Sequence, residues 1–315
     1  MTSKVSKANM ANQFSTVIVF GPTGDVGGAA ALEASKRGAK VWLAMRNLDK
    51  SIKAITKEQE QQGSFHRIQA DLSDADSVKQ AVQQSGAKAA FIYFTPGIEG
   101  SIQAMKDAGI EYVVFLSSFS LEADHPLRQI PPSEFIPYVH AQVEIALEDA
   151  GIAHTSLRPA QFASNGLKMN TDQSKSPWEA KVAFARLRSD CIAPNDIGRV
   201  GGAVLVNRPS SAAKDVIYLC GPQLLTADEQ FDIIMRVSGK KIEVVHQNHE
   251  DYTKYMIGKG IPPPVVKYLV EFMAKADNES IYPDYLYKEG LANIKKYSGY
   301  EPTSFEEYVS SQNLG

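Results

Sequence analysis

Short apolar runs alternate with amphipathic stretches along the first half of the chain. Six runs rich in β-branched and aromatic residues predict strands: VIVF (17–20), KVWLAM (40–45), HRIQ (66–69), AAFIYF (89–94), YVVFLSS (112–118) and HTSLR (154–158). Four of the intervening helical stretches end at a glycine, which is a common signal for a helix C-terminus. Because strand–helix alternation with nearly continuous apolar strands is typical of a parallel sheet covered on both faces, the pattern predicts a doubly wound α/β fold of the Rossmann type.

This alternation stops after Pro159. Residues 163–190 are polar and irregular, so we expect a mobile loop or lid there. Asp196 precedes the apolar pattern IGRVGGAVLV and is placed to cap a helix. The run DVIYLCG (215–221) predicts one more buried strand.

The C-terminal part has helix signals and many aromatic residues. Thr226 and Glu229 have capping-box spacing, which predicts a helix through Val237. Three prolines at 262–264 precede the helical pattern VVKYLVEFMAKA. Tyrosine and phenylalanine are frequent between residues 252 and 308, and we expect them to wall a substrate site at the sheet edge.

These patterns divide the chain into four parts. Residues 1–13 are expected to form a flexible polar tail, and residues 14–160 the Rossmann-type domain to which 191–222 return. Residues 161–190 and 223–315 are expected to form a smaller, mostly helical substrate-binding region.

Composition excludes several classes of function. A net charge of −3 gives no general attraction for nucleic acid or anionic membranes, and no apolar run approaches the roughly 20 residues of a membrane span. Cys191 and Cys220 are isolated, and His246 and His249 lack a third ligand, so we expect no metal site. Without a secretory signal pattern at the N-terminus, the chain is expected in the cytoplasm.

The segment GPTGDVG follows the first predicted strand and opens the first predicted helix. Its glycines, Gly21, Gly24 and Gly27, permit a tight turn and let the backbone approach a phosphate. The helix that begins at about Asp25 offers free N–H groups to the same anion. A purely structural glycine turn is the alternative, but the strand–loop–helix context favours binding of a dinucleotide.

The end of the second strand indicates which dinucleotide. NAD-binding proteins usually place an acidic residue there to bind the ribose 2′-hydroxyl, whereas this chain has Arg46, followed by Lys50. A cation suits a 2′-phosphate, so NADP(H) is the predicted cofactor. The alternative is that Arg46 is a solvated strand-end charge.

Further candidates follow the other strands, whose carboxyl ends face the ligand crevice in such folds. Asp71 is placed to accept a hydrogen bond from adenine, although it could instead cap a helix, a role for which Asp74 is better placed. Phe94 and Thr95 are expected to pack along the cofactor, and Ser117 lies at the corresponding end of the fifth strand.

The motifs together resemble the NmrA-like family of atypical short-chain dehydrogenase/reductases. The matching segments are GPTGDVG, Arg46, ADL (70–72), FLSS (115–118), VEIALEDAGIAHTSLRPAQFASN (143–165) and NDIGRV (195–200). The resemblance implies a Rossmann domain with a small substrate domain and a preference for NADP(H). It also implies cofactor contacts from the matched motif positions Thr23, Val26, Leu72 and Pro159.

The chain departs from related enzymes at the catalytic helix. Ordinary short-chain dehydrogenases carry Tyr-x-x-x-Lys there, but this helix has Gln142 four residues after Tyr138. The family's reductases tend to have a lysine four residues before the helix glutamate, and counting back from Glu144 gives His140. His140 is the predicted proton donor, oriented by Glu144, and Tyr138 and Ser117 are further candidates. The alternatives are a helix histidine without a role and a tyrosine that only packs.

Three functions fit these observations. The first is an NADPH-dependent reductase of a small aromatic or conjugated carbonyl or quinone-type metabolite, with a second copy of the chain as partner. The second is a non-catalytic NADP(H)-binding redox sensor that acts through a protein partner, and the third is a redox-neutral isomerase or lyase. Fold resemblance alone does not separate them.

Overall fold

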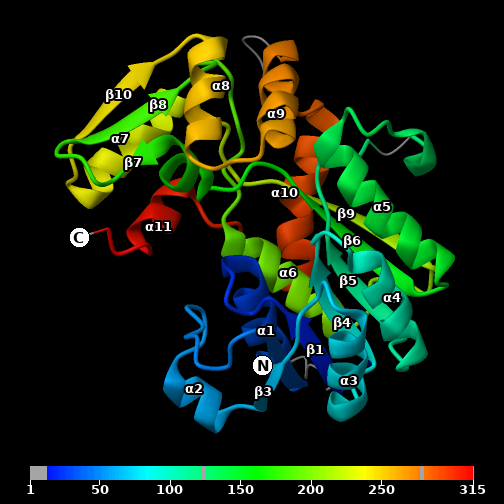
Figure 1. Cartoon of the computed structure of the whole chain (residues 1–315). Helices are drawn as coiled ribbons and strands as arrows, with labels where there is room; N and C mark the ends of the chain where they lie inside the picture. Colours follow the sequence, from blue (N-terminus) through cyan, green and yellow to red (C-terminus); the bar gives the residue numbers. More distant parts are fainter. Residues whose placement is uncertain (1–12, 123–124, 277–279, 315) are drawn as a thin grey trace, which may run out of the picture.

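A seven-stranded parallel sheet forms the centre of the molecule in the computed structural model, which describes residues 13–122, 125–276 and 280–314 (Figure 1). Its strands follow the order β3-β2-β1-β4-β5-β6-β9, so the strand order reverses between β1 and β4. Their bounds are β1 Thr16–Phe20, β2 Lys40–Met45, β3 Phe65–Gln69, β4 Ala89–Tyr93, β5 Tyr112–Leu116, β6 Ala153–Pro159 and β9 Lys214–Leu219. The Rossmann-type fold predicted from the alternation is therefore confirmed.

Helices cover both faces of this sheet. One face packs against α1 (Asp25–Lys36), α6 (Pro194–Val206) and α10 (Asp284–Ser298), and the other against α3 (Ala75–Ser85), α4 (Ile98–Asp107) and α5 (Phe135–Asp149). Alternate residues of each strand serve the two faces: Val17 and Val19 lie in the first core, Ile18 and Phe20 in the second. This two-sided burial explains why the strands read as continuous apolar runs.

Helices α1 and α6 approach each other closely through glycine. A Cβ on Gly198 would lie 2.4 Å from the Cβ of Ala29, and one on Gly202 would lie 2.4 Å from the carbonyl oxygen of Ala30. The close approach fixes the start of α1, and with it the glycine loop, against the sheet.

A smaller unit stands beside the sheet, at the upper left of Figure 1. It contains a second sheet of three strands in the order β10-β8-β7. The strands are β7 Thr171–Asp172, β8 Trp178–Val182 and β10 Ile242–His246, and the helices are α7 Ala227–Ser238, α8 His249–Gly258, α9 Pro263–Lys275 and α11 Phe305–Ser310. The expectation of an irregular segment over 163–190 is thus wrong, because β8 pairs with β10 and buries Ala180 and Val182.

The remaining differences are local. Helix α2 (Lys57–Gln62) has no apolar face to reveal it in the sequence, and none of its residues is buried. Asp196 lies inside the first turn of α6 instead of capping it, since Ala193 is the N-cap. The buried Asp196 carboxylate instead accepts hydrogen bonds from the backbone N–H and hydroxyl of Thr303, at 2.7 and 2.8 Å. Residues 1–12 of the predicted tail lie outside the described residues.

Helix α10 packs on β9 and contributes Ile294 to the core of the large sheet. It lies in a part of the chain that we expected to belong to the substrate region. No helix among the described residues is long and apolar enough to cross a membrane.

Candidate active site

The glycine loop between β1 and α1 is shaped by its backbone. Gly21 has φ +69°, a left-handed conformation that favours glycine, and a Cβ on Gly27 would lie 2.4 Å from the carbonyl oxygen of Gly21. At Gly24 a Cβ would meet only that oxygen, at 3.5 Å. The conformation of the loop therefore requires glycine at positions 21 and 27. At position 24 the absence of a side chain instead leaves the outer side of the loop open.

A cleft of about 380 Å³ lies over this loop. We call it the glycine-loop cleft; its lining includes Gly21, Thr23, Gly24, Asp25, Val26 and Gly27. Because the first N–H groups of α1 have no partners within the helix, they offer hydrogen bonds to an anion at this end. The cleft thus brings together the predicted loop residues.

Arg46 lies directly after β2, and its loop is fixed by a neighbouring strand. Arg67 of β3 donates from Nη1 to the carbonyl oxygens of Leu48 and Lys50. Hydrogen bonds from Ser73 lower the pKa of Asp71, and the charge of Arg46 lowers it further. Gln69 Nε2 at the end of β3 donates to the carbonyl oxygen of Arg46, so the ends of β2 and β3 lie side by side. The exposed Arg46 and Lys50 therefore stand at the edge predicted for a 2′-phosphate. The sequence does not single out Arg67, since a strand arginine has no distinctive sequence signal.

Three other predicted cofactor residues lie around this region. Leu72 is buried in the sheet core with Ile68 and Ala70, and Thr95 accepts a backbone hydrogen bond from Ile98 at the start of α4. The Asp71 carboxylate accepts from the backbone and the hydroxyl of Ser73, while Asp74 caps α3.

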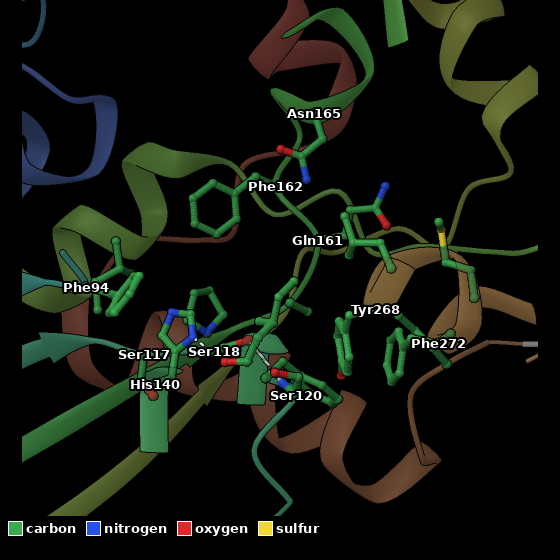
Figure 2. Close-up of a pocket in the computed structure, with 18 of the residues that line it drawn as sticks. Phe94, Ser117, Ser118, Ser120, His140, Gln161, Phe162, Asn165, Tyr268 and Phe272 are labelled. Carbon is green, nitrogen blue, oxygen red and sulfur yellow. Dashed lines mark hydrogen bonds between the residues drawn. The ribbon is translucent and has the colours of Figure 1, made fainter. Parts of the chain in front are cut away.

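A second, aromatic cavity of about 460 Å³ lies beside the glycine-loop cleft (Figure 2). Its lining includes Phe94, Ser117, His140, Pro159, Phe162, Tyr268, Phe272 and Tyr282. His140 lies beside Ser117 and Phe94 at one end, and the rings of Tyr268 and Phe272 stand together at the other. Tyr268, Phe272 and Tyr282 from the C-terminal part line this cavity, and their role as walls of a substrate site stays a prediction.

Two amide side chains also face this cavity. Gln161 and Asn165 follow β6 and line the cavity, where Figure 2 shows them above the rings of Tyr268 and Phe272. Both also line a side chamber of about 100 Å³ beneath α7 and α8. An amide group can donate and accept hydrogen bonds, so these residues can bind the polar groups of a ligand. The sequence alone does not identify these two amides as site residues.

The imidazole of His140 is held by its own helix. Its Nδ1 lies 2.8 Å from the carbonyl oxygen of Ile136, and because a carbonyl can only accept, Nδ1 carries a proton. Burial lowers the pKa of His140, so the ring is neutral at pH 7 and its Nε2 is a hydrogen-bond acceptor. The expectation that Glu144 orients this ring is wrong.

Glu144 instead anchors a buried ion network beneath the cavity. Its carboxylate accepts from Ser117 Oγ at 2.8 Å and from Arg158 Nη2 at 2.9 Å, and Lys214 Nζ lies 3.1 Å away. Burial acts to raise the pKa of Glu144, but Arg158 and Lys214 outweigh it and lower the pKa to about 2. The Ser117 hydroxyl therefore donates its hydrogen bond to a carboxylate that stays ionised at neutral pH, and it offers a ligand only its lone pairs.

Tyr138 faces away from His140. Two residues along a helix correspond to a rotation of about 200°, so the two side chains cannot share one face. Tyr138 packs on Leu121, Ile130 and Ala141 in a separate apolar cluster. The structure therefore supports the alternative, a tyrosine that only packs, and not the expected proton donor.

The far wall of the cavity depends on Asp190. Its buried carboxylate accepts from the backbone N–H groups of Gln161 and Gly221 and from the Tyr282 hydroxyl, at 2.9, 2.7 and 2.7 Å. Burial raises the pKa of Asp190 to about 6, although these hydrogen bonds oppose the shift. The carboxylate therefore ties the ends of β6 and β9 to Tyr282.

Solved structures share this architecture. The quinone oxidoreductase of Escherichia coli described as NADPH-dependent, solved with NADPH, matches with a TM-score of 0.68 at 18% identity, covering 94% of this chain and 99% of that one. The triphenylmethane reductase of Citrobacter, solved with NADP(H), matches with a TM-score of 0.63 at 18% identity, covering 95% and 100%. At this identity the likeness establishes the fold.

Sequence relatives extend over most of the chain. The nitrogen metabolite regulation-like protein bik4 of Gibberella fujikuroi is 39% identical over 95% of this chain and 97% of its own. Agroclavine dehydrogenase of Claviceps fusiformis is 24% identical over 68% and 69%. The model of the NmrA-like family matches residues 13–309. With a family match over nearly its whole length, this chain belongs to the NmrA-like family.

Proposed function

We propose that this protein is an NADP(H)-dependent oxidoreductase that reduces a small aromatic or conjugated carbonyl or quinone-type compound. The observation that carries the proposal is the continuity of the two sites. Tyr93, Leu116 and Phe162 line both the glycine-loop cleft and the aromatic cavity. A dinucleotide held by the loop can therefore extend along these shared residues and present its far end to a ligand in the cavity.

The residues present fit NADP(H). Gly24 leaves open the side on which a pyrophosphate would approach the start of α1, and Arg46 and Lys50 supply cations for a 2′-phosphate. When bound, the cofactor supplies the hydride. The solved neighbours with NADPH or NADP(H) support this assignment.

The cavity favours an uncharged, planar substrate. Among the described residues, its lining contains no aspartate, glutamate, lysine or arginine, and His140 is neutral at pH 7. Aromatic walls bury planar rings, whereas an unpaired charge would lose its hydration without compensation. Gln161 and Asn165 are then available for neutral oxygen substituents of the substrate.

Proton transfer in this site depends on His140. In its neutral form Nε2 can only accept a hydrogen bond, from a hydroxyl group of a ligand or from water. Delivery of a proton to a substrate oxygen requires the protonated ring, which burial disfavours. The Ser117 hydroxyl directs its hydrogen bond to Glu144, so it can position the substrate but does not protonate it.

The proposed function is tested by NADPH oxidation. Purified protein is mixed with NADPH and a panel of neutral quinones and aromatic ketones, each paired with a carboxylated analogue, and the absorbance of NADPH is followed. We expect turnover with neutral compounds and much weaker turnover with their charged partners. NADPH binding without turnover of any panel member would contradict the reductase proposal.

Replacement of Arg46 by alanine tests the cofactor preference. A charge-assisted contact to a 2′-phosphate is worth about 1.5–3 kcal/mol, so the Kd for NADPH should rise roughly 10- to 100-fold, with little change for NADH. Fluorescence titration measures both constants. Lys40→Ala, which removes an exposed cation from the opposite end of β2, is the control. Equal losses for both cofactors would remove the 2′-phosphate assignment.

The pH dependence of turnover tests His140. Because burial lowers its pKa, the protonated donor accumulates only below the ordinary value of 6.5. We expect the reduction rate to increase as pH falls through the lowered pKa, and His140→Ala to be slower and to lose this dependence. An alanine variant with the parent's rate and pH profile would show that His140 takes no part.

A non-catalytic NADP(H)-binding regulator is the second candidate. Two observations favour it: the relative at 39% identity is named as a regulation-like protein, and His140 stands in the site as an acceptor with a lowered pKa. In that case the protein would bind NADPH and oxidise none of the panel, and a protein partner would respond to cofactor occupancy.

A further inference from the structure

An ion pair joins the start of the first helix, beside the glycine loop, to the smaller unit. Lys168 Nζ lies 2.6 Å from Asp25 Oδ2, and both residues line the glycine-loop cleft. Asp25 begins α1, whereas Lys168 lies 143 residues later in the π-helical turn η2 (Gly166–Asn170). Such short π-helical segments frequently occur at functional sites.

Stability does not account for this pair. The Lys168 side chain is 63% exposed, and an exposed ion pair contributes little to folding. The position of the Asp25–Lys168 pair in the cleft indicates a role in ligand binding instead. Among the described residues of the lining, Asp25 and Lys168 are the charged side chains. Without Lys168, the cleft would present a carboxylate to any phosphate that approached the loop.

We propose that Lys168 binds the pyrophosphate of the dinucleotide while it neutralises Asp25. An ammonium group has three N–H donors, so a hydrogen bond to Asp25 leaves others for a phosphate oxygen. The site is thus completed from the smaller unit, by a residue outside the glycine motif. This inference rests on the proposed binding of NADP(H).

The same turn also reaches the ligand side of the site. Asn165, directly before η2, lines the aromatic cavity, and Met169 and Asn170 line the side chamber. Lys168 thus lies in one short segment between the phosphate end and the substrate end of the site. Cofactor binding would fix this segment and the cavity wall that it carries.

Affinity measurements on the parent and on substituted proteins test the proposal. Fluorescence titration gives the Kd for NADPH of the parent, Lys168→Met, Asp25→Asn and the double variant. We expect Lys168→Met to weaken binding roughly tenfold or more, because a charge-assisted contact is lost and Asp25 is left uncompensated. The double variant should remain weaker than Asp25→Asn, since the contact to phosphate is missing there as well. Lys168→Arg should retain most of the affinity.

Lys175→Met is the matched control, because it removes another exposed lysine from an ion pair, that with Glu179. It should bind NADPH as the parent does. If the parent binds NADPH and Lys168→Met binds it equally well, this inference fails while the proposed function stands. If the double variant matches Asp25→Asn, Lys168 only neutralises Asp25 and direct binding is refuted. A parent that does not bind NADPH overturns both proposals.

Discussion

Gly27→Ala should disrupt both the fold around the glycine loop and the binding of NADPH. The new Cβ would lie 2.4 Å from the carbonyl oxygen of Gly21, a backbone atom that cannot move aside without shifting the loop. Overpacking of this kind costs about 3 kcal/mol, and the displaced loop would no longer cradle a phosphate. Urea denaturation and NADPH titration measure the two effects.

Gly24→Ala separates the two effects. Its Cβ would meet the nearest backbone atom at 3.5 Å, and Gly24 already has φ −82°, which alanine adopts without strain. As alanine is a poorer helix N-cap, we expect a loss of stability within about 1 kcal/mol. The methyl group would nevertheless stand where the pyrophosphate approaches, so binding of NADPH should be lost. A Gly24→Ala variant with the parent's affinity would contradict the assignment of this cleft.

The sequence predicted best those features that depend on interactions between residues close together in the chain. The six predicted strands of the first half correspond to β1–β6 within a few residues, because doubly buried strands must be apolar on both sides. The capping box of Thr226 and Glu229 is present at the start of α7, since both side chains satisfy N–H groups within four residues. The roles that we propose for the glycine loop and Arg46 rest on the same strand–loop–helix order.

Tertiary contacts decided what local patterns could not. Strand β8 is recognisable only once β10 lies beside it, and Tyr138 packs on Leu121 and Ile130, which precede its helix. Helical spacing alone places Glu144 one turn from His140, but Arg158 and Lys214 come from β6 and β9 and hold its carboxylate instead. Lys168 and Asp190 likewise gain their neighbours from distant parts of the chain.

Glu144→Gln should destabilise the protein strongly at neutral pH. The Arg158 side chain is only 3% exposed, and the substitution would leave its guanidinium without the carboxylate that pairs with it. Breaking a buried pair in this way costs about 3–5 kcal/mol. Glu148→Gln is the matched control, because Glu148 pairs with the same Lys214 from the same helix but its side chain is 39% exposed, so we expect a loss below about 1 kcal/mol.

The effect of this substitution should depend on pH in a defined direction. The folded-state pKa of Glu144, about 2, lies below the ordinary 4.5, so the charged carboxylate contributes stability above pH 4.5. That contribution, about 3 kcal/mol from the difference in pKa, is lost as pH falls from 4.5 towards 2. The stability gap between parent and Glu144→Gln, measured by urea denaturation, should therefore narrow between pH 7 and pH 3. If the gap were the same at both pH values, the charge of Glu144 would not be the source of its stabilising effect, and shape complementarity at the cavity floor would have to supply it.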